Sequence, residues 1–254
     1  MKYGFIVLKL LKFGTLISFA LSFLFLAQVF GWQFGLGLLL LIAVHEFGHV
    51  LFAKWEGLPV SAPIFLGPLG ALITMKRPPA DRRQEAVVAI GGPVIGTAGA
   101  LACFGASQLM SGQVSYLLIG LAYFGSFLNL FNLIPLSPLD GGRVAGALSK
   151  WANVAGLAIF SALIVGSLGS HRLFNPLLLI ILLVGGYGTI KRFQRDRRGE
   201  EPPPLPARTR RWIAVAYVAM LAITSLGMSV AHNALVDGNY VPAPSSSTVD
   251  SGDL

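Results

Sequence analysis

Two histidines and a glutamate lie close together in an apolar stretch of the chain, in the order His45-Glu46-Phe47-Gly48-His49. On a helix, residues i and i+4 share one face, so the two imidazoles can reach the same metal ion. Glu46 stands beside them, where its carboxylate can take a proton from a metal-bound water. The spacing therefore predicts a metal site with an adjacent general base.

The surroundings of this pattern favour the metal interpretation. The sequence contains only four histidines, and two of them lie within the apolar stretch 34–53. Ionisable side chains are costly inside hydrocarbon, so those found there usually serve a function. The alternative is that the His and Glu side chains only hold helices together by hydrogen bonding to one another.

A third ligand is needed, because catalytic zinc sites usually take three protein ligands and leave the fourth position to water. Of the 11 acidic residues, only Glu46 and Asp140 lie outside the expected loops, span edges and tail. The extended motif of soluble proteases would place another histidine six residues after His49, where this chain has Trp55. Asp140 is therefore the candidate third ligand.

The composition indicates a membrane protein. Of the 254 residues, 54% are hydrophobic and 12% are charged, whereas soluble proteins have about 25% charged residues. The formal net charge of +8 comes from basic residues placed between apolar runs, which argues against a nucleic-acid partner, because such a partner needs them gathered on one face. The single cysteine, Cys103, lies in an apolar run and is interpreted as a packing residue.

Seven apolar stretches have the length of about 17 to 25 residues that a helix needs to cross hydrocarbon. They are residues 13–30, 34–53, 86–110, 114–135, 151–169, 174–190 and 212–230. The first is interpreted as an uncleaved span, because it is long and no Ala-x-Ala site follows it. The predicted fold class is an all-α polytopic membrane protein with about seven transmembrane helices.

The distribution of Lys and Arg predicts the orientation, because cytoplasmic loops carry the excess of both. All but one of the 19 basic residues precede the first stretch or lie in the loops after the second, fourth and sixth stretches, and the exception is Arg172. We therefore expect a multi-pass protein of the bacterial cell membrane. Its N-terminus and active site would face the cytoplasm, and its C-terminus would lie outside.

Two segments between the stretches differ in composition. Residues 58–75 are apolar but interrupted by Pro and Gly, which predicts a small β-hairpin or re-entrant element between the second and third helices. Residues 191–211 are charged and proline-rich and are interpreted as a spacer rather than a docking motif. The expected division is a first helix with an outer loop (1–33), a catalytic membrane core (34–150), two more helices (151–190), a cytoplasmic linker (191–211), a seventh helix (212–231) and a disordered polar tail (232–254).

The predicted depths of the two histidines and of Asp140 in the membrane allow these side chains to lie close together. Counted from the outer end of stretch 34–53, His45 and His49 lie about 17 to 23 Å into a core about 30 Å thick. A continuous helix from residue 114 would carry Asp140 about 39 Å, beyond that core. Pro135 and a second proline three residues later break the helix and can hold the carboxylate near the histidines.

Asp140 also belongs to a second motif. The segment 132–141 has the arrangement Asn-x-x-Pro-x-x-x-x-Asp-Gly downstream of His-Glu-x-x-His, and the two motifs together resemble the site-2 protease family of intramembrane zinc metallopeptidases. The Gly-Pro-Leu-Gly of residues 67–70 and the Gly-Gly-Pro of residues 91–93 are also similar to that family. The resemblance covers about residues 34–150.

The resemblance implies an enzyme that uses one catalytic Zn²⁺ to hydrolyse peptide bonds of membrane-spanning or membrane-anchored proteins. Under it, His45, His49 and Asp140 would bind zinc. Glu46 would be the general base and Asn132 would help to position the substrate. Asn132 has an alternative role in an interhelical hydrogen bond.

Several small or polar residues near these motifs are interpreted as packing residues. They include Asn129 and the small-x-x-x-small series of Gly92, Gly96 and Ala100. The chain departs from the family here, because many relatives carry an asparagine shortly after the Gly-Pro pair, and this chain has Gly96 and Thr97. The departure removes an expected polar contact to the substrate.

Two other functions fit parts of the pattern. One is a membrane zinc-binding protein without peptidase activity, and Glu46 argues against it because binding alone needs no base. The other is a metal transporter, but transport folds usually show internal repeats and polar groups along a pathway, whereas the ionisable residues here lie at one depth. The expected partners are transmembrane protein substrates and the lipid bilayer.

Overall fold

The computed structural model describes residues 2–67, 70–168, 176–200 and 202–237. These residues form α1 (Lys2–Phe30), α2 (Trp32–Trp55), β1 (Ile64–Phe65), β2 (Ala71–Leu72), α3 (Arg82–Ser107), α4 (Gly112–Asn132), α5 (Asp140–Leu148), α6 (Lys150–Leu168), α7 (Pro176–Arg197) and α8 (Ala207–Asp237). The predicted helical fold class is confirmed. The short helix α5 was not expected from the sequence.

Four of the described helices, α2, α3, α4 and α8, are long and apolar enough to cross a membrane. Two shorter apolar helical segments, Gly14–Phe30 and Lys150–Gly166, belong to α1 and α6. Helix α7 begins with an apolar run and ends in the charged sequence KRFQRDR. The helices agree with a polytopic membrane protein, and the number of seven spans stays a prediction.

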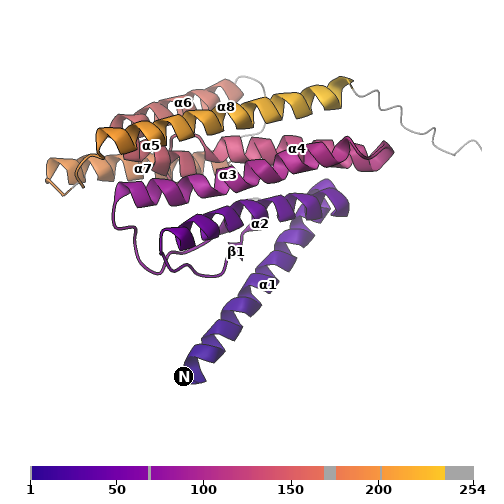
Figure 1. Cartoon of the computed structure of the whole chain (residues 1–254), viewed down its shortest axis with the longest axis horizontal. Coiled ribbons are helices and arrows are strands. Elements are labelled where there is room, and N and C mark those ends of the chain that lie inside the picture. The colour runs from indigo at the N-terminus through magenta and orange to yellow at the C-terminus, as the bar shows by residue number, and fades with distance from the viewer. Residues whose placement is uncertain (1, 68–69, 169–175, 201, 238–254) are drawn as a thin grey trace, which may run out of the picture.

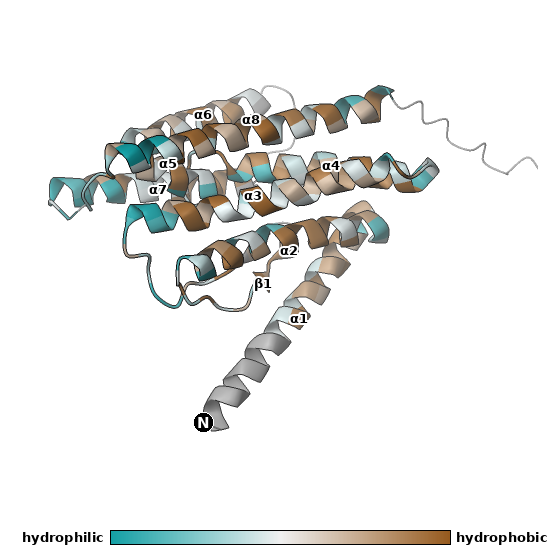
Figure 2. Cartoon of the chain, in the orientation of Figure 1, coloured by the Kyte–Doolittle hydropathy of each residue, from teal (hydrophilic) through white to brown (hydrophobic). Residues whose placement is uncertain are grey.

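Helix α3 is the central element of the bundle. It packs against α2, α4, α5 and α8, and α4 also packs against α8. These helices run roughly side by side, whereas α1 leaves the bundle obliquely (Figure 1). Hydrophilic residues gather at the left-hand ends of α3, α7 and α8 in Figure 2, and the lengths of the helices between are mostly apolar. The bundle therefore has a polar end beside its apolar body.

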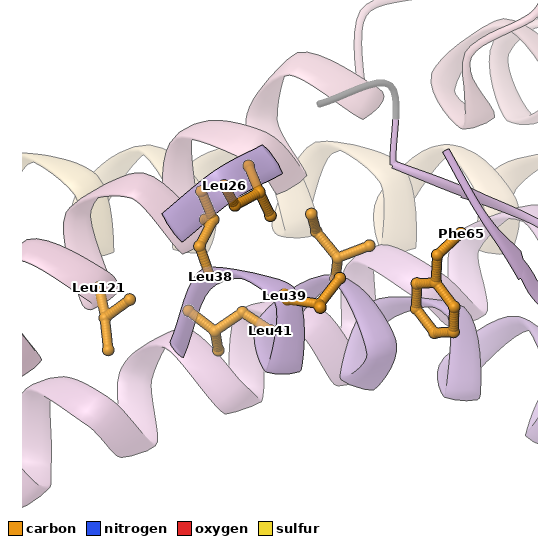
Figure 3. Packing of buried hydrophobic residues seen from close by; sticks show 7 residues of the cluster. Leu26, Leu38, Leu39, Leu41, Phe65 and Leu121 are labelled. Atoms are coloured by element: carbon orange, nitrogen blue, oxygen red, sulfur yellow. The ribbon is translucent and has the colours of Figure 1, made fainter. Parts of the chain in front are cut away.

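An apolar cluster joins α1, α2, α4 and the strand β1. Figure 3 labels six of its members, namely Leu26, Leu38, Leu39, Leu41, Phe65 and Leu121. Phe65 also meets Phe19 of α1 edge-on, with the ring centroids 5.2 Å apart. Close packing gives such side chains many van der Waals contacts, which are small individually and large in sum. The cluster therefore holds β1 against α1 and α2.

The two short strands pair in antiparallel fashion, with Ile64 opposite Leu72 and Phe65 opposite Ala71. A bridge between Val60 and Met75 continues the pairing towards the base of the loop. Residues 60–65 and 71–75 thus lie side by side between α2 and α3.

Helices α2 and α3 approach each other closely at two glycines. A Cβ on Gly48 would overlap the carbonyl oxygen of Gly91. A Cβ on Gly91 would lie 2.6 Å from the Phe52 ring and 2.8 Å from the carbonyl oxygen of Gly48. The two backbones therefore meet without side chains between them, and the His-bearing face of α2 lies directly against α3.

The helical conformation is interrupted between α4 and α5, where the sequence predicts a break. Leu133 and Leu136 in the connecting turn are fully buried, and the Ser137–Pro138 peptide bond is cis. The hydroxyl of Tyr217 in α8 donates a hydrogen bond to the carbonyl oxygen of Leu133. Helix α8 thus braces the turn that brings Asp140 back into the bundle.

The contact between α2 and α3 yields a first prediction. Gly48→Ala should lower the free energy of unfolding by about 1 to 3 kcal/mol, because the new methyl group has no space. Thermal unfolding of the purified protein in detergent measures the effect. Gly105→Ala is the matched control, since a Cβ there meets no atom within 4 Å. Equal unfolding temperatures for Gly48→Ala and the unmodified protein would contradict the proposed close approach.

Candidate metal centre

Three potential metal ligands from two helices converge in the interior. His45 and His49 lie one turn apart on α2, and Asp140 is the first residue of α5. The two Nε2 atoms are 3.2 Å apart, and Asp140 Oδ2 is 3.2 Å from each of them. Within the described ranges, this is the group of His, Cys, Asp and Glu side chains whose ligand atoms all lie within 4.8 Å of one another. The structure thus brings the three residues singled out from the sequence to one point.

Hydrogen bonds on the far side of each imidazole decide which ring nitrogen carries the proton. His49 Nδ1 lies 2.9 Å from the carbonyl oxygen of Val88, which can only accept, so Nδ1 is the donor. His45 Nδ1 lies 2.8 Å from Asn129 Oδ1, and the Asn129 amide is oriented by its own donation to the carbonyl oxygen of Gly125. With both Nδ1 atoms protonated, each neutral ring presents a lone pair on Nε2.

Two lone pairs and a carboxylate oxygen at these separations repel one another unless a cation lies between them. A zinc ion about 2.0 to 2.2 Å from its ligands keeps neighbouring ligand atoms about 3.3 to 3.6 Å apart in tetrahedral geometry. The observed separations of 3.2 Å are close to that range. Two imidazoles and one carboxylate also match the ligand types of catalytic zinc sites. The residues therefore fit a zinc ion with a fourth position left for water.

A cavity of about 380 Å³ opens beside the three ligands. Glu46 lines it, follows His45 directly on α2 and is buried. Asn132 at the end of α4 also lines it, and its Nδ2 donates to the carbonyl oxygen of Leu128 at 3.1 Å. All the site residues predicted from the sequence thus border one cavity, although Asn132 does not contact either imidazole.

Asn129 and two glycines have roles at the site that the sequence did not reveal. The sequence assigns Asn129 to packing, whereas the structure places it as the hydrogen-bond partner of His45. A Cβ on Gly92 would overlap His49 Nε2, and a Cβ on Gly96 would overlap Asn129 Oδ1. The small-residue series on α3 therefore makes room for the metal ligands and for Asn129. The spacing of Asn129, three residues before Asn132 and on the same helical face, is the signal that could have revealed it.

Comparison with known proteins agrees with this arrangement. Residues 33–113 match the model of peptidase family M50. This segment contains both histidines, Glu46 and the Gly-Gly-Pro of α3, and it ends before Asp140. That region of the chain is therefore similar to peptidase family M50, the site-2 protease family.

Proteins that are similar in sequence to this chain carry zinc metalloprotease names. The chain is 33% identical over 169 residues to a putative zinc metalloprotease, sll0528, of Synechocystis, covering 59% of this chain and 41% of that protein. It is 31% identical over 109 residues to the zinc metalloprotease MJ0392 of Methanocaldococcus jannaschii, covering 42% and 31%. It is 28% identical over 177 residues to the probable chloroplastic zinc metalloprotease EGY2 of Arabidopsis thaliana, covering 54% and 31%. The chain spans less than half the length of these relatives.

The hydrogen bond between His45 and Asn129 yields a second prediction. Asn129→Ala should weaken zinc binding about 10- to 100-fold, because the imidazole loses the partner that fixes its protonation and orientation. Competition with a chromogenic chelator measures the affinity.

Asn132→Ala is the control for this measurement, because Asn132 touches neither imidazole and should leave the zinc affinity unchanged. Unaltered zinc affinity in Asn129→Ala would remove Asn129 from the metal centre.

Proposed function

We propose that this protein is an intramembrane zinc metalloendopeptidase that hydrolyses peptide bonds of membrane-spanning or membrane-anchored proteins. The observation that carries the proposal is the convergence of His45, His49 and Asp140 beside Glu46 at the wall of one cavity. The zinc metalloprotease names of the relatives support the same chemistry. A zinc-storage protein would not need a carboxylate next to the ligands at the wall of an open cavity.

Each side chain of the site has a separate role in hydrolysis. Bound zinc would supply a Lewis acid for the scissile carbonyl and a water that is nucleophilic near neutral pH. Glu46 accepts the proton of the attacking water and later passes a proton to the leaving amine. Asn132 has a second amide hydrogen, beyond the one given to Leu128, to donate to the substrate backbone. His45 and His49 are held rigid by their Nδ1 hydrogen bonds, so the ligand geometry is set before the substrate arrives.

The strand β2 offers a place for an extended substrate. Gly70, Ala71, Ile73 and Met75 line the catalytic cavity. Thr74 and Lys76 direct their backbone groups to the segment of residues 59–61, through the bonds Ser61 N to Thr74 O and Lys76 N to Pro59 O. Because backbone groups alternate along a strand, those of Met75 point to the opposite edge. A substrate segment can add to that edge, which supplies the hydrogen bonds that unwinding of its helix removes.

The other edge of this small sheet is already covered by α1. The hydroxyls of Ser18 and Ser22 accept hydrogen bonds from the backbone nitrogens of Phe65 and Gly67, at 3.1 and 2.8 Å. Thr15 donates to the carbonyl oxygen of Pro63 at 2.8 Å. Three hydroxyls on one face of α1 thus form hydrogen bonds with backbone groups on the β1 side. Strand pairing with a substrate is thereby directed to the β2 side, which borders the catalytic residues.

The proposal includes the orientation that the basic residues predict. The polar ends of α3, α7 and α8 would then face the cytoplasm of a bacterial cell, and the catalytic cavity would open towards that side. Regulated intramembrane proteolysis, in which a membrane-anchored substrate is cut close to this surface, is the process that such a placement serves.

The role of Glu46 yields a third prediction. Glu46→Gln should lower the cleavage rate of a membrane-anchored reporter by about 100- to 10,000-fold, because the amide cannot take the proton of water. Bound zinc, measured by mass spectrometry of the metal, should be retained.

Glu200→Gln is the matched control, because Glu200 is exposed and pairs with Arg198 at the polar end. Full cleavage activity in Glu46→Gln would end the peptidase hypothesis, whereas loss of zinc in that variant would assign Glu46 to the metal instead of the base role.

The role of Asn132 yields a fourth prediction. Asn132→Ala should lower kcat/KM about 10- to 100-fold while zinc content and thermal stability stay unchanged, because it removes a hydrogen bond made to the substrate. Steady-state cleavage of a reporter in detergent measures the constants. A lower unfolding temperature with unchanged kcat/KM would leave Asn132 with a structural role alone, through its hydrogen bond to Leu128 within α4.

A further inference from the structure

The third ligand of the metal centre lacks the support that the two histidines have. Each imidazole has a hydrogen bond on the far side of its ring, to Asn129 or to Val88. Among the described residues, the partners of the Asp140 carboxylate are the two imidazoles alone. Their lone pairs repel the carboxylate until a cation binds between them. The position of Asp140 before zinc binds must therefore be set by its backbone.

That backbone continues from the turn of residues 133–139, which two neighbouring helices contact closely. A Cβ on Gly156 of α6 would lie 2.1 Å from the carbonyl oxygen of Pro135. A Cβ on Gly185 of α7 would lie 2.5 Å from the carbonyl oxygen of Ser137. The backbones therefore touch without side chains between them. The turn has no space to move towards α6 or α7.

Helix α8 contacts the same turn with a hydrogen-bonding side chain. Leu133 is the C-terminal cap of α4, and the last carbonyl groups of a helix have no partner within it. The Tyr217 hydroxyl donates to the Leu133 carbonyl oxygen. The Tyr217 ring is buried in one apolar cluster with Leu133 and with Val144 of α5. Because Leu133 is fully buried, water does not replace this donor.

We propose that Tyr217 is a positioning residue of the metal centre, whose hydrogen bond to Leu133 holds Asp140 within reach of the histidines before zinc binds. Repulsion between the carboxylate and the imidazole lone pairs favours withdrawal of Asp140. The hydrogen bond from α8 opposes the movement of the turn that such a withdrawal requires. Without the hydroxyl, part of the protein holds Asp140 away from the site. The apparent zinc affinity then falls in proportion to the fraction that stays competent.

The packing of α8 suits it to this role. It contacts α3, α4 and α5, and it runs along the bundle in Figure 1. Helix α3 carries the Val88 carbonyl that orients His49, α4 carries Asn129, and α5 begins at Asp140. One helix thus contacts the three elements that orient or supply the ligands. Helix α8 is therefore part of the metal centre, although it contributes no ligand.

The zinc affinity of the purified protein in detergent, measured by competition with a chromogenic chelator, tests the proposal. Tyr217→Phe removes the hydroxyl and keeps the ring. It should weaken zinc binding about 3- to 10-fold, because the competent fraction falls by that factor.

Thr224→Val is the matched control. Thr224 is also a buried residue of α8, and its hydroxyl is hydrogen-bonded to that of Thr97 in α3 at 3.0 Å. It lies about 10 Å further along α8 than Tyr217. The variant should lower the unfolding temperature and keep the zinc affinity within about twofold of the unmodified protein.

Gly156→Ala probes the same turn from α6, because the new methyl group must displace the Pro135 carbonyl. It should also weaken zinc binding. Gly166→Ala is its control on the same helix, since a Cβ there meets no atom within 4 Å. Unchanged zinc affinity in this control is the expected result.

The visible spectrum of bound Co²⁺ reports the ligand set and its geometry. Tyr217→Phe should reach the same saturated spectrum as the unmodified protein, at a higher cobalt concentration, because the same three ligands bind. Equal losses of thermal stability in Tyr217→Phe and Thr224→Val, with unchanged zinc affinity in both, would overturn the proposal. Neither measurement uses peptide cleavage, so the result does not depend on the proposed peptidase function.

Discussion

Three lone pairs that converge at 3.2 Å in an apolar interior are the constraint on which the rest of the structure depends. Such a cluster is unfavourable without a cation, because a low-dielectric interior does not screen the repulsion. Neighbouring residues hold the three ligand side chains in place. Val88 and Asn129 fix the protonation of the imidazoles, and the brace from Tyr217 supports the turn that returns Asp140 to the bundle.

Helix α3 contributes no ligand to the cluster, and its glycines leave the space that the ligands need. Gly91 lets the backbones of α2 and α3 touch, Gly92 leaves space for the imidazoles, and Gly96 leaves space for Asn129. Close backbone approach is a common way for helices to associate where lipid offers no hydrophobic driving force. Here the same approach also builds the site. These glycines have no reactive side chain, yet they control whether the ligands can come together.

The small sheet and α5 both contribute to the wall of the catalytic cavity. The hydroxyls of α1 hold the small sheet so that its β2 edge borders the cavity. Arg143 of α5 lines the catalytic cavity and also a second cavity at the polar end of the bundle. The membrane core, its entry strand and its polar end form one connected unit.

The sequence by itself determined the membrane class, the His pair with its neighbouring base, and the candidacy of Asp140. Those features are local, because helical periodicity sets which residues share a face and the scarcity of charge in apolar stretches marks the exceptions. Only the tertiary structure decided the partners of the imidazoles, the helix α5 and the role of α8. Those features depend on which helices pack together and at what distance, and an apolar helix has many equally apolar faces from which sequence periodicity cannot choose.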